Sequence, residues 1–160
     1  MPTPDFVLAL REQIGHHPLW LPGVTAVVLR DGPRGPQVLL VRRADSGAWT
    51  PVTGIVDPGE EPAVAAAREV LEEAGVVAEA ERLASVSVTD TVTYANGDVS
   101  RYLDLTFRFR YVAGEPHPAD GENTAAAWFD LGDIPALSAD MDARLQSALA
   151  DEAAARFARR

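Results

Sequence analysis

Two apolar runs near the start of the chain have the pattern of buried β-strands. Residues 23–30 (GVTAVVLR) and 37–43 (QVLLVRR) are nearly continuous in aliphatic side chains. Such runs are typical of strands that are covered on both faces. The segment between them, residues 31–36, is rich in Gly and Pro and is predicted to be a turn-rich loop. These runs therefore predict two central strands of one sheet.

The second half of the chain shows the alternating pattern of further strands. Residues 82–92 alternate in part, and residues 102–111 (YLDLTFRFRY) alternate cleanly, which predicts a long antiparallel strand. The Asn96-Gly97 pair before it favours a hairpin with a type I′ turn. On the polar face of this strand, Asp104 and Arg108 either border a substrate or, more simply, form a cross-strand charge pair. A loop over residues 113–123 then precedes a last strand, 124–129.

Three segments have helical periodicity. Residues 5–14 carry an apolar stripe and are followed by Gly15, residues 62–74 precede Gly75, and residues 141–157 form a predicted terminal helix. The terminal stripe consists of Leu145, Ala148, Leu149, Ala153 and Phe157. Strands on both sides of the middle helix, with helices at both ends, predict an α/β protein with a mixed β-sheet between helical layers.

The middle helix collects carboxylates on one side. Glu69, Glu72 and Glu73 have the spacings of residues that share a helix face. The opposite side is predicted to be the core face: Val64, Ala67, Val70, Leu71 and Ala74. Like charges at these spacings repel, and anions near a helix C-terminus are disfavoured by its dipole. Either a divalent cation such as Mg²⁺ or Mn²⁺ removes both penalties, or the acids form a solvated surface.

Composition narrows the class of protein. A chain of 160 residues is expected to form a single domain, residues 1–160. It has no Cys, which excludes disulfides and thiolate sites, and its net charge of −10 argues against a general nucleic-acid binder. We see no membrane-length apolar run and no signal peptide in the sequence, so the expected location is cytoplasmic.

The acidic helix belongs to a longer motif that resembles a known family. Gly54 is followed after five residues by Glu60, after seven more by Arg68-Glu69-Val70, and then by Glu72-Glu73 and Gly75-Val76. This spacing resembles the complete Nudix box. The resemblance implies a Nudix-type α/β/α sandwich that hydrolyses the diphosphate of a nucleoside diphosphate linked to another group. Mg²⁺ or Mn²⁺ would be the cofactor.

The resemblance also implies roles for individual residues. Glu69, Glu72 and Glu73 would be metal ligands, and Glu73 or Glu72 would also orient or deprotonate the attacking water. Arg68 would pair with Glu60 or with a ligand. Gly54 and Gly75 would serve backbone geometry. Glu122, in the loop before the last strand, occupies the place of an additional ligand or general base; Asp120 and Glu115 are its rivals, and a plain surface acid is the alternative.

The sequence says less about the substrate. Arg42 and Arg43 are either a phosphate clamp or a solvated strand end. Tyr94 lies eighteen residues after Val76, a position that the family links with dinucleoside polyphosphates. Nucleotide sugars such as ADP-ribose and nucleoside triphosphates stay open as well. The expected partner is a small nucleotide rather than a nucleic-acid polymer or a membrane, with a homodimer as one expected assembly. The alternative function is a nucleotide sensor that binds without turnover.

Overall fold

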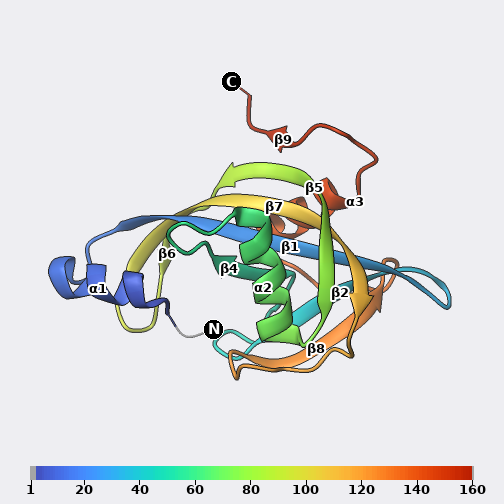
Figure 1. The fold of residues 1–160 in the computed structure, drawn as a ribbon, viewed down its shortest axis with the longest axis horizontal. Helices are drawn as coiled ribbons and strands as arrows, with labels where there is room; N and C mark the ends of the chain where they lie inside the picture. The colour runs from blue at the N-terminus through green and yellow to red at the C-terminus, as the bar shows by residue number, and fades with distance from the viewer. Residues whose placement is uncertain (1–2, 160) are drawn as a thin grey trace.

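The computed structural model describes residues 3–159 and shows a mixed β-sheet with helices on both faces (Figure 1). The predicted α/β class is confirmed. The helices are α1 (Asp5–Ile14), α2 (Pro62–Ala74) and α3 (Ala139–Leu149). The strands are β1 (Leu19–Gly32), β2 (Gly35–Arg43), β3 (Trp49–Thr50), β4 (Val52–Ile55), β5 (Val77–Val88), β6 (Val92–Thr93), β7 (Val99–Ala113), β8 (Asn123–Asp130) and β9 (Arg156–Phe157).

The centre of the sheet is the parallel pair of β1 and β7. The strands run in the order β3-β2-β1-β7-β5-β9, while β4 pairs with β1 and β8 pairs with β2 in antiparallel fashion. The two long aliphatic runs are therefore central strands, as predicted. Because β4 lies beside β1, it brings the start of the acidic motif to the middle of the sheet.

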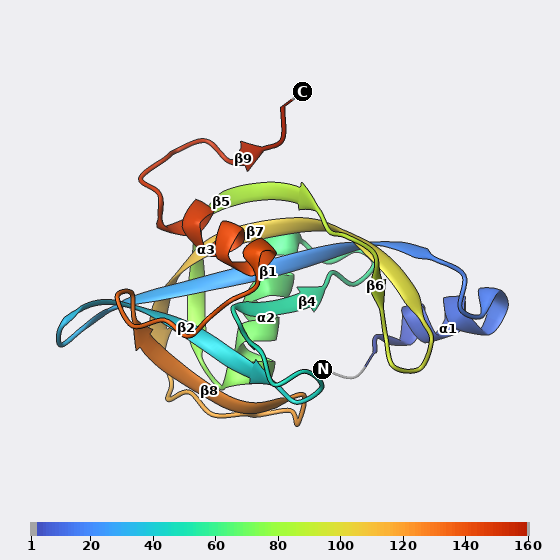
Figure 2. The same cartoon turned by 180° about the vertical axis from the view of Figure 1, so that it is seen from behind.

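Helix α2 covers one face of the sheet and α3 covers the other (Figures 1 and 2). Side chains alternate between these two layers along β1: Val24, Ala26 and Val28 pack with α2, whereas Val27 packs with α3. Because both faces of β1 are covered, its sequence is a continuous apolar run. Within residues 3–159, none of the helices is both long and apolar enough to cross a membrane.

The orientation of α2 differs from the prediction. Val64 and Leu71, predicted to be core residues, are 59% and 52% exposed, whereas Glu69 and Glu73 are only 1% and 3% exposed. The helix meets the sheet through small or slim side chains that permit a close approach: Ala65, Ala66, Val70 and Ala74. Val70 and Ala74 are buried as predicted, but the buried face is rotated from the predicted one, because the close contact with the sheet also encloses two carboxylates.

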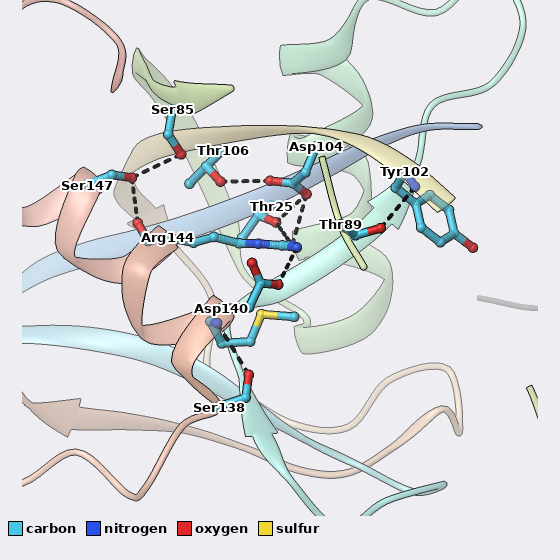
Figure 3. A network of polar contacts seen from close by, with 11 residues as sticks. Thr25, Ser85, Thr89, Tyr102, Asp104, Thr106, Ser138, Asp140, Arg144 and Ser147 are labelled. Atoms are coloured by element: carbon cyan, nitrogen blue, oxygen red, sulfur yellow. Dashed lines mark hydrogen bonds and ion pairs between the residues drawn. The ribbon is translucent and has the colours of Figure 1, made fainter. Parts of the chain in front are cut away.

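The face of β7 that looked polar is also buried. Asp104 and Thr106 are 3% and 0% exposed, because α3 covers them and supplies Arg144. Asp104 therefore pairs with a helix across the layer and does not border a substrate (Figure 3). Arg108 does form the predicted cross-strand pair, with its Nε 2.9 Å from Glu81 Oε2.

The terminal helix is shorter than predicted. It begins after Ser138, whose hydroxyl accepts a hydrogen bond from the Met141 amide, and it ends at Leu149 rather than Phe157. Arg82 of β5 donates to the carbonyl oxygens of Ser147, Ala148 and Ala150, which satisfies the end of the helix. The chain beyond it forms β9 against β5 and leaves Phe157 59% exposed.

The hairpin between β6 and β7 is present, but its turn type was predicted wrongly. Tyr94 and Asp98 close the loop, and the Gly97 amide donates to the Tyr94 carbonyl at 2.9 Å. Only glycines have positive φ in the described chain, so Asn96 does not adopt the conformation that a type I′ turn requires. The loop instead places Gly97 alone in the left-handed region, with φ of 90°.

Helix α1 has the predicted bounds and ends at Gly15, whose φ is 58°. Val7 is buried, and Leu10 is 40% exposed, so only part of the predicted apolar stripe packs. Arg11 fastens the helix to the start of β7 by donating to the Val99 carbonyl at 2.8 Å and to the Ser100 hydroxyl at 3.1 Å. The helix therefore docks on the chain's own sheet.

Candidate active site

The acidic motif consists of a turn, the helix α2 and a glycine that ends the helix. The Glu60 amide donates to the Asp57 carbonyl at 3.0 Å, and the Asp57 amide returns a bond to Glu60 Oε2 at 3.2 Å. Pro62 opens α2, where its missing N–H costs nothing. Gly75 ends the helix with φ of 67° and donates its amide to the Leu71 carbonyl. These bounds agree with the sequence prediction.

Gly54 of β4 gives Glu69 the space that it occupies. A Cβ atom at Gly54 would lie 2.2 Å from the Glu69 Cδ atom, which no real structure tolerates. The φ of Gly54 is not positive, so the glycine is not needed here for a left-handed backbone conformation. Its role is steric, because a bare backbone there admits the carboxylate between α2 and the sheet.

Arg68 gathers three carboxylates of the motif. It binds Glu60 in a bidentate manner, with Nε–Oε1 and Nη2–Oε2 distances of 2.9 Å each. Its Nη1 atom lies 3.1 Å from Glu69 Oε1 and 3.2 Å from Glu72 Oε2. The pKa of the Arg68 guanidinium is raised, first by the hydrogen bond to Glu60, then by the charges of the other two acids. The predicted pairing of Arg68 with Glu60 is present.

Glu69 is a buried carboxylate with one oxygen in need of a partner. Oε1 accepts from Arg68, but Oε2 is buried and has no hydrogen-bond partner among the described residues. Burial raises the pKa of Glu69 to about 8, although Arg68 acts in the opposite direction. A buried acceptor without a donor typically costs about 1–3 kcal/mol. The fold thus encloses an acid whose charged form is poorly balanced.

Glu73 is equally buried and is held by a different kind of group. Its Oε2 accepts a hydrogen bond of 2.9 Å from Asn123 Nδ2, at the first residue of β8. The pKa of Glu73 is raised to about 7, mainly by burial and also by the charges of Asp120 and Glu122, while the hydrogen bond from Asn123 opposes the shift. We did not single out Asn123 from the sequence. Its only signal there is a polar residue between an acidic loop and an apolar strand.

The loop that carries Glu122 is fastened to the end of α2. The amides of His117 and Ala119 donate to the carbonyls of Ala74 and Glu73 at 3.0 and 3.2 Å. The Ala44 amide donates to the Glu122 carbonyl at 2.8 Å, and the Glu122 amide donates to Asp120 Oδ1 at 3.0 Å. Both Glu122 and Asp120 are therefore brought near Glu73.

The two arginines at the end of β2 diverge. Arg43 is held by Asp45 at 2.8 Å; this bond raises its pKa, and the charges of Glu73 and Glu122 add to the effect. Arg42 is exposed and donates to the Gly47 carbonyl at 3.1 Å. Only Arg43 thus shows an electrostatic link to the acids, and the two side chains do not act as one clamp.

Tyr94 lies at the hairpin beside another tyrosine. Its hydroxyl is 2.5 Å from that of Tyr102. Burial and this hydrogen bond raise the pKa of Tyr94, and the charges of Arg43 and Asp45 also act on it. Tyr94 therefore lies on the side of Arg43, with 39% of its surface exposed.

The donors in this region fit a hard divalent cation by their chemistry. They are carboxylate oxygens, which Mg²⁺ and Mn²⁺ prefer, and the unpartnered Glu69 Oε2 is a buried acceptor that a cation would satisfy. As arranged in residues 3–159, no three Asp, Glu or His side chains form a ready metal site. Arg68 occupies part of the space between the acids, so binding requires its contacts with Glu69 and Glu72 to loosen.

Known proteins resemble this chain in sequence. The chain is 30% identical over 128 residues to the "NAD-capped RNA hydrolase NudC" of Stutzerimonas stutzeri, which covers 79% of this chain and 42% of that relative. It is 33% identical over 133 residues to a "MutT-like protein" of Streptomyces ambofaciens, covering 82% of this chain and 79% of the relative. The chain thus spans less than half of the NudC relative's length.

A solved structure agrees as well. The MutT NUDIX hydrolase from Burkholderia pseudomallei superimposes with a TM-score of 0.59 at 28% identity, covering 81% of this chain and 98% of that one. The pattern of the NUDIX domain family matches residues 20–151, which include every element from β1 to α3 apart from the first residue of β1. The chain therefore belongs to the NUDIX domain family.

Proposed function

We propose that this protein is a Nudix pyrophosphohydrolase that uses a divalent cation to hydrolyse a diphosphate bond in a nucleoside diphosphate derivative. The observation that carries the proposal is the burial of Glu69 and Glu73 at the centre of the motif, with raised pKa values and an oxygen that has no partner. Perturbed acids in such a position are typical of functional sites. Family membership and the names of the relatives, hydrolase and diphosphatase, support the same class.

Four acids of the site would bind the cation. We assign Glu69, Glu72 and Glu73 as cation ligands, with Glu122 of the loop as an additional one. Bound Mg²⁺ or Mn²⁺ would shield the diphosphate charge and lower the pKa of bound water. Arg68 holds Glu60 by two hydrogen bonds, which fixes the turn before α2 and keeps the guanidinium beside the ligands.

The hydrolytic step needs a base and a leaving group. The oxygen of water forms a bond to one phosphorus, the bond from that phosphorus to the bridging oxygen breaks, and the bridging oxygen leaves on the other phosphate. A carboxylate takes the proton of water; Glu73 and Glu122 are the candidates, with Glu72 as the alternative.

The substrate is expected to be a small nucleotide. Arg43 is our candidate for a phosphate contact, because the charge of Glu73 acts on it. Arg42, which precedes it in β2, and Tyr94, in the loop between β6 and β7, are further candidates for contacts with the nucleotide. Dinucleoside polyphosphates, ADP-ribose-type nucleotide sugars and nucleoside triphosphates are all compatible with this set. The name of the NudC relative adds NAD-capped RNA as a candidate to test.

A substrate panel tests the proposal. Purified protein with Mg²⁺ or Mn²⁺ is incubated with members of each class, and the products are separated by ion-exchange chromatography. We expect cleavage within the diphosphate of at least one class, and loss of cleavage with EDTA. Nucleotide binding by calorimetry with no product from any substrate would instead identify a sensor.

A further inference from the structure

The side chain of Glu73 has a single hydrogen-bonding partner in the described structure, Asn123. The two side chains are 3% and 4% exposed, and the Nδ2–Oε2 distance is 2.9 Å. A carboxylate oxygen only accepts hydrogen bonds, so the amide must present Nδ2 to Glu73. The contact therefore fixes which way both buried groups point.

The backbone around Asn123 is anchored on both sides. Asn123 begins β8 and pairs in register with Arg43, next to the irregularity between Arg42 and Arg43 in β2. The Glu122 carbonyl before it accepts from the Ala44 amide at 2.8 Å. An amide on an anchored strand end is a stiff support, whereas one on a free loop would not be.

The chemistry of Asn123 differs from that of the group that holds the other acids. Glu60, Glu69 and Glu72 are held by Arg68, which supplies a positive charge with its hydrogen bonds. Asn123 is neutral, so it orients the Glu73 carboxylate without neutralising it. The nearby cation Arg43 is engaged by Asp45 at 2.8 Å. The charge of Glu73 is thus left for another partner.

We infer that Asn123 is a positioning residue for metal binding: it holds Glu73 Oε2 so that the remaining oxygen, Oε1, is presented to a divalent cation. The inference rests on the proposed function, because it assumes that Glu73 binds the cation. Partners that orient a metal ligand typically change metal affinity by about 10- to 100-fold when they are removed. Asn123 lies outside the motif of residues 54–76.

The test is a calorimetric titration of metal-free protein with Mn²⁺ alone. Asn123→Leu removes the donor while keeping the approximate volume, and we expect its Mn²⁺ dissociation constant to rise by about 10-fold or more. Asn123→Ser, whose hydroxyl is too short to reach Glu73, should show the same loss and serves if the leucine variant does not fold. Thr124→Val, which loses only an exposed bond of 3.3 Å on the adjacent residue, is the matched control and should bind like wild type.

A double variant separates positioning from a general structural role. In the Glu73→Ala background, Asn123→Leu should have little further effect on the Mn²⁺ dissociation constant, because the carboxylate that Asn123 holds is gone. An equal loss in both backgrounds would overturn the inference, as would folded Asn123 variants that bind Mn²⁺ like wild type.

The titration also distinguishes this inference from the proposed function. If wild type binds Mn²⁺ and hydrolyses a nucleotide while the Asn123 variants bind equally well, only the inference fails. If wild type neither binds Mn²⁺ nor hydrolyses any nucleotide of the panel, the proposed function fails and the inference with it.

Discussion

Each face of the sheet has an arginine among carboxylates, Arg144 on one and Arg68 on the other, but the two arginines balance the charges of their acids differently. On the α3 face, Arg144 Nη1 lies 3.0 Å from Asp104 Oδ1, and the hydroxyls of Thr25 and Thr106 donate to the two oxygens of Asp104 at 2.8 Å (Figure 3). Burial raises the pKa of Asp104, and Arg144 and the hydroxyls oppose that shift. Every carboxylate oxygen in this pair has a donor, so the network ties a helix to the sheet.

On the α2 face the same kinds of group are left unbalanced. Arg68 serves three acids, Glu69 keeps a buried oxygen without a partner among the described residues, and Glu73 has only a neutral amide. Buried charges are normally paired because desolvation is costly. The comparison separates two kinds of buried acid: both oxygens of Asp104 have donors, whereas Glu69 keeps an oxygen without a partner among the described residues, and we propose that incomplete pairing marks the functional acids.

The largest predicted effect is on turnover. Glu73→Gln keeps the shape and the burial of the side chain but removes its charge, so hydrolysis should fall by about 100-fold or more. The melting temperature should stay the same or rise, because a poorly balanced charge is removed. Steady-state assays with the cleaved nucleotide measure the rate, and Glu79→Gln, an exposed acid on β5, is the control. Full activity in Glu73→Gln would remove Glu73 from the mechanism.

A substitution in the network of Asp104, Arg144, Thr25 and Thr106 on the α3 face should lower stability far more than turnover. Arg144→Met leaves Asp104 buried without its cation and should cost about 3–5 kcal/mol of unfolding free energy. Turnover per folded molecule should change far less than in Glu73→Gln. Urea denaturation measures the loss, and Arg156→Met, which breaks an exposed pair with Glu152, should leave the free energy of unfolding nearly unchanged. Similar losses in the two variants would mean that the buried network is not a structural tie.

The metal-free protein should become less stable as pH rises. Burial raises the pKa values of Glu69 and Glu73 to about 8 and about 7, so the folded protein holds more protons than the unfolded chain above about pH 4.5. The stability from the neutral acids is complete below that pH and is lost as pH rises through 7 and 8.

Since one pKa unit is worth about 1.4 kcal/mol, the change should be on the order of a few kcal/mol. Urea denaturation in EDTA across this pH range measures it. Added Mg²⁺ should oppose the loss, whereas a flat profile in EDTA would contradict the burial of charged acids at this site.

The smallest predicted effect tests the steric role of Gly54. Gly54→Ala places a methyl group where Glu69 lies and should cost about 1–3 kcal/mol of stability. In a Glu69→Ala background the space is free, so the same substitution should cost little. Thermal unfolding of the four proteins gives the coupling; an equal cost in both backgrounds would mean that the glycine is needed for another reason.

These contrasts also show what the sequence could predict. The bounds of α2, its stop at Gly75 and the pairing of Arg68 with Glu60 follow from local patterns of capping and spacing. The rotation of α2 does not, because it depends on Gly54 of β4 admitting Glu69 against the sheet. The end of α3 depends on Arg82, which is remote in sequence.

For the candidate site, too, the sequence predicted the local features and missed those that depend on long-range contacts. The acids of residues 54–76 have a fixed spacing, and the position of Glu122 near Glu73 agrees with the expectation for the loop. Asn123 and the divergence of Arg42 from Arg43 were not foreseen, because contacts between β2, β8 and α2 decide them. Local patterns thus identified the chemical groups, and long-range packing determined how they are held.

The central claim is that the buried acids of α2 bind a divalent cation. Anomalous diffraction from a crystal soaked in Mn²⁺ tests it most directly. We predict a peak about 2.0–2.3 Å from carboxylate oxygens of Glu69 and Glu73, with Arg68 moved away from Glu69. Strong diffraction with no peak at these acids at saturating Mn²⁺, or a peak only at exposed acids elsewhere, would contradict the account.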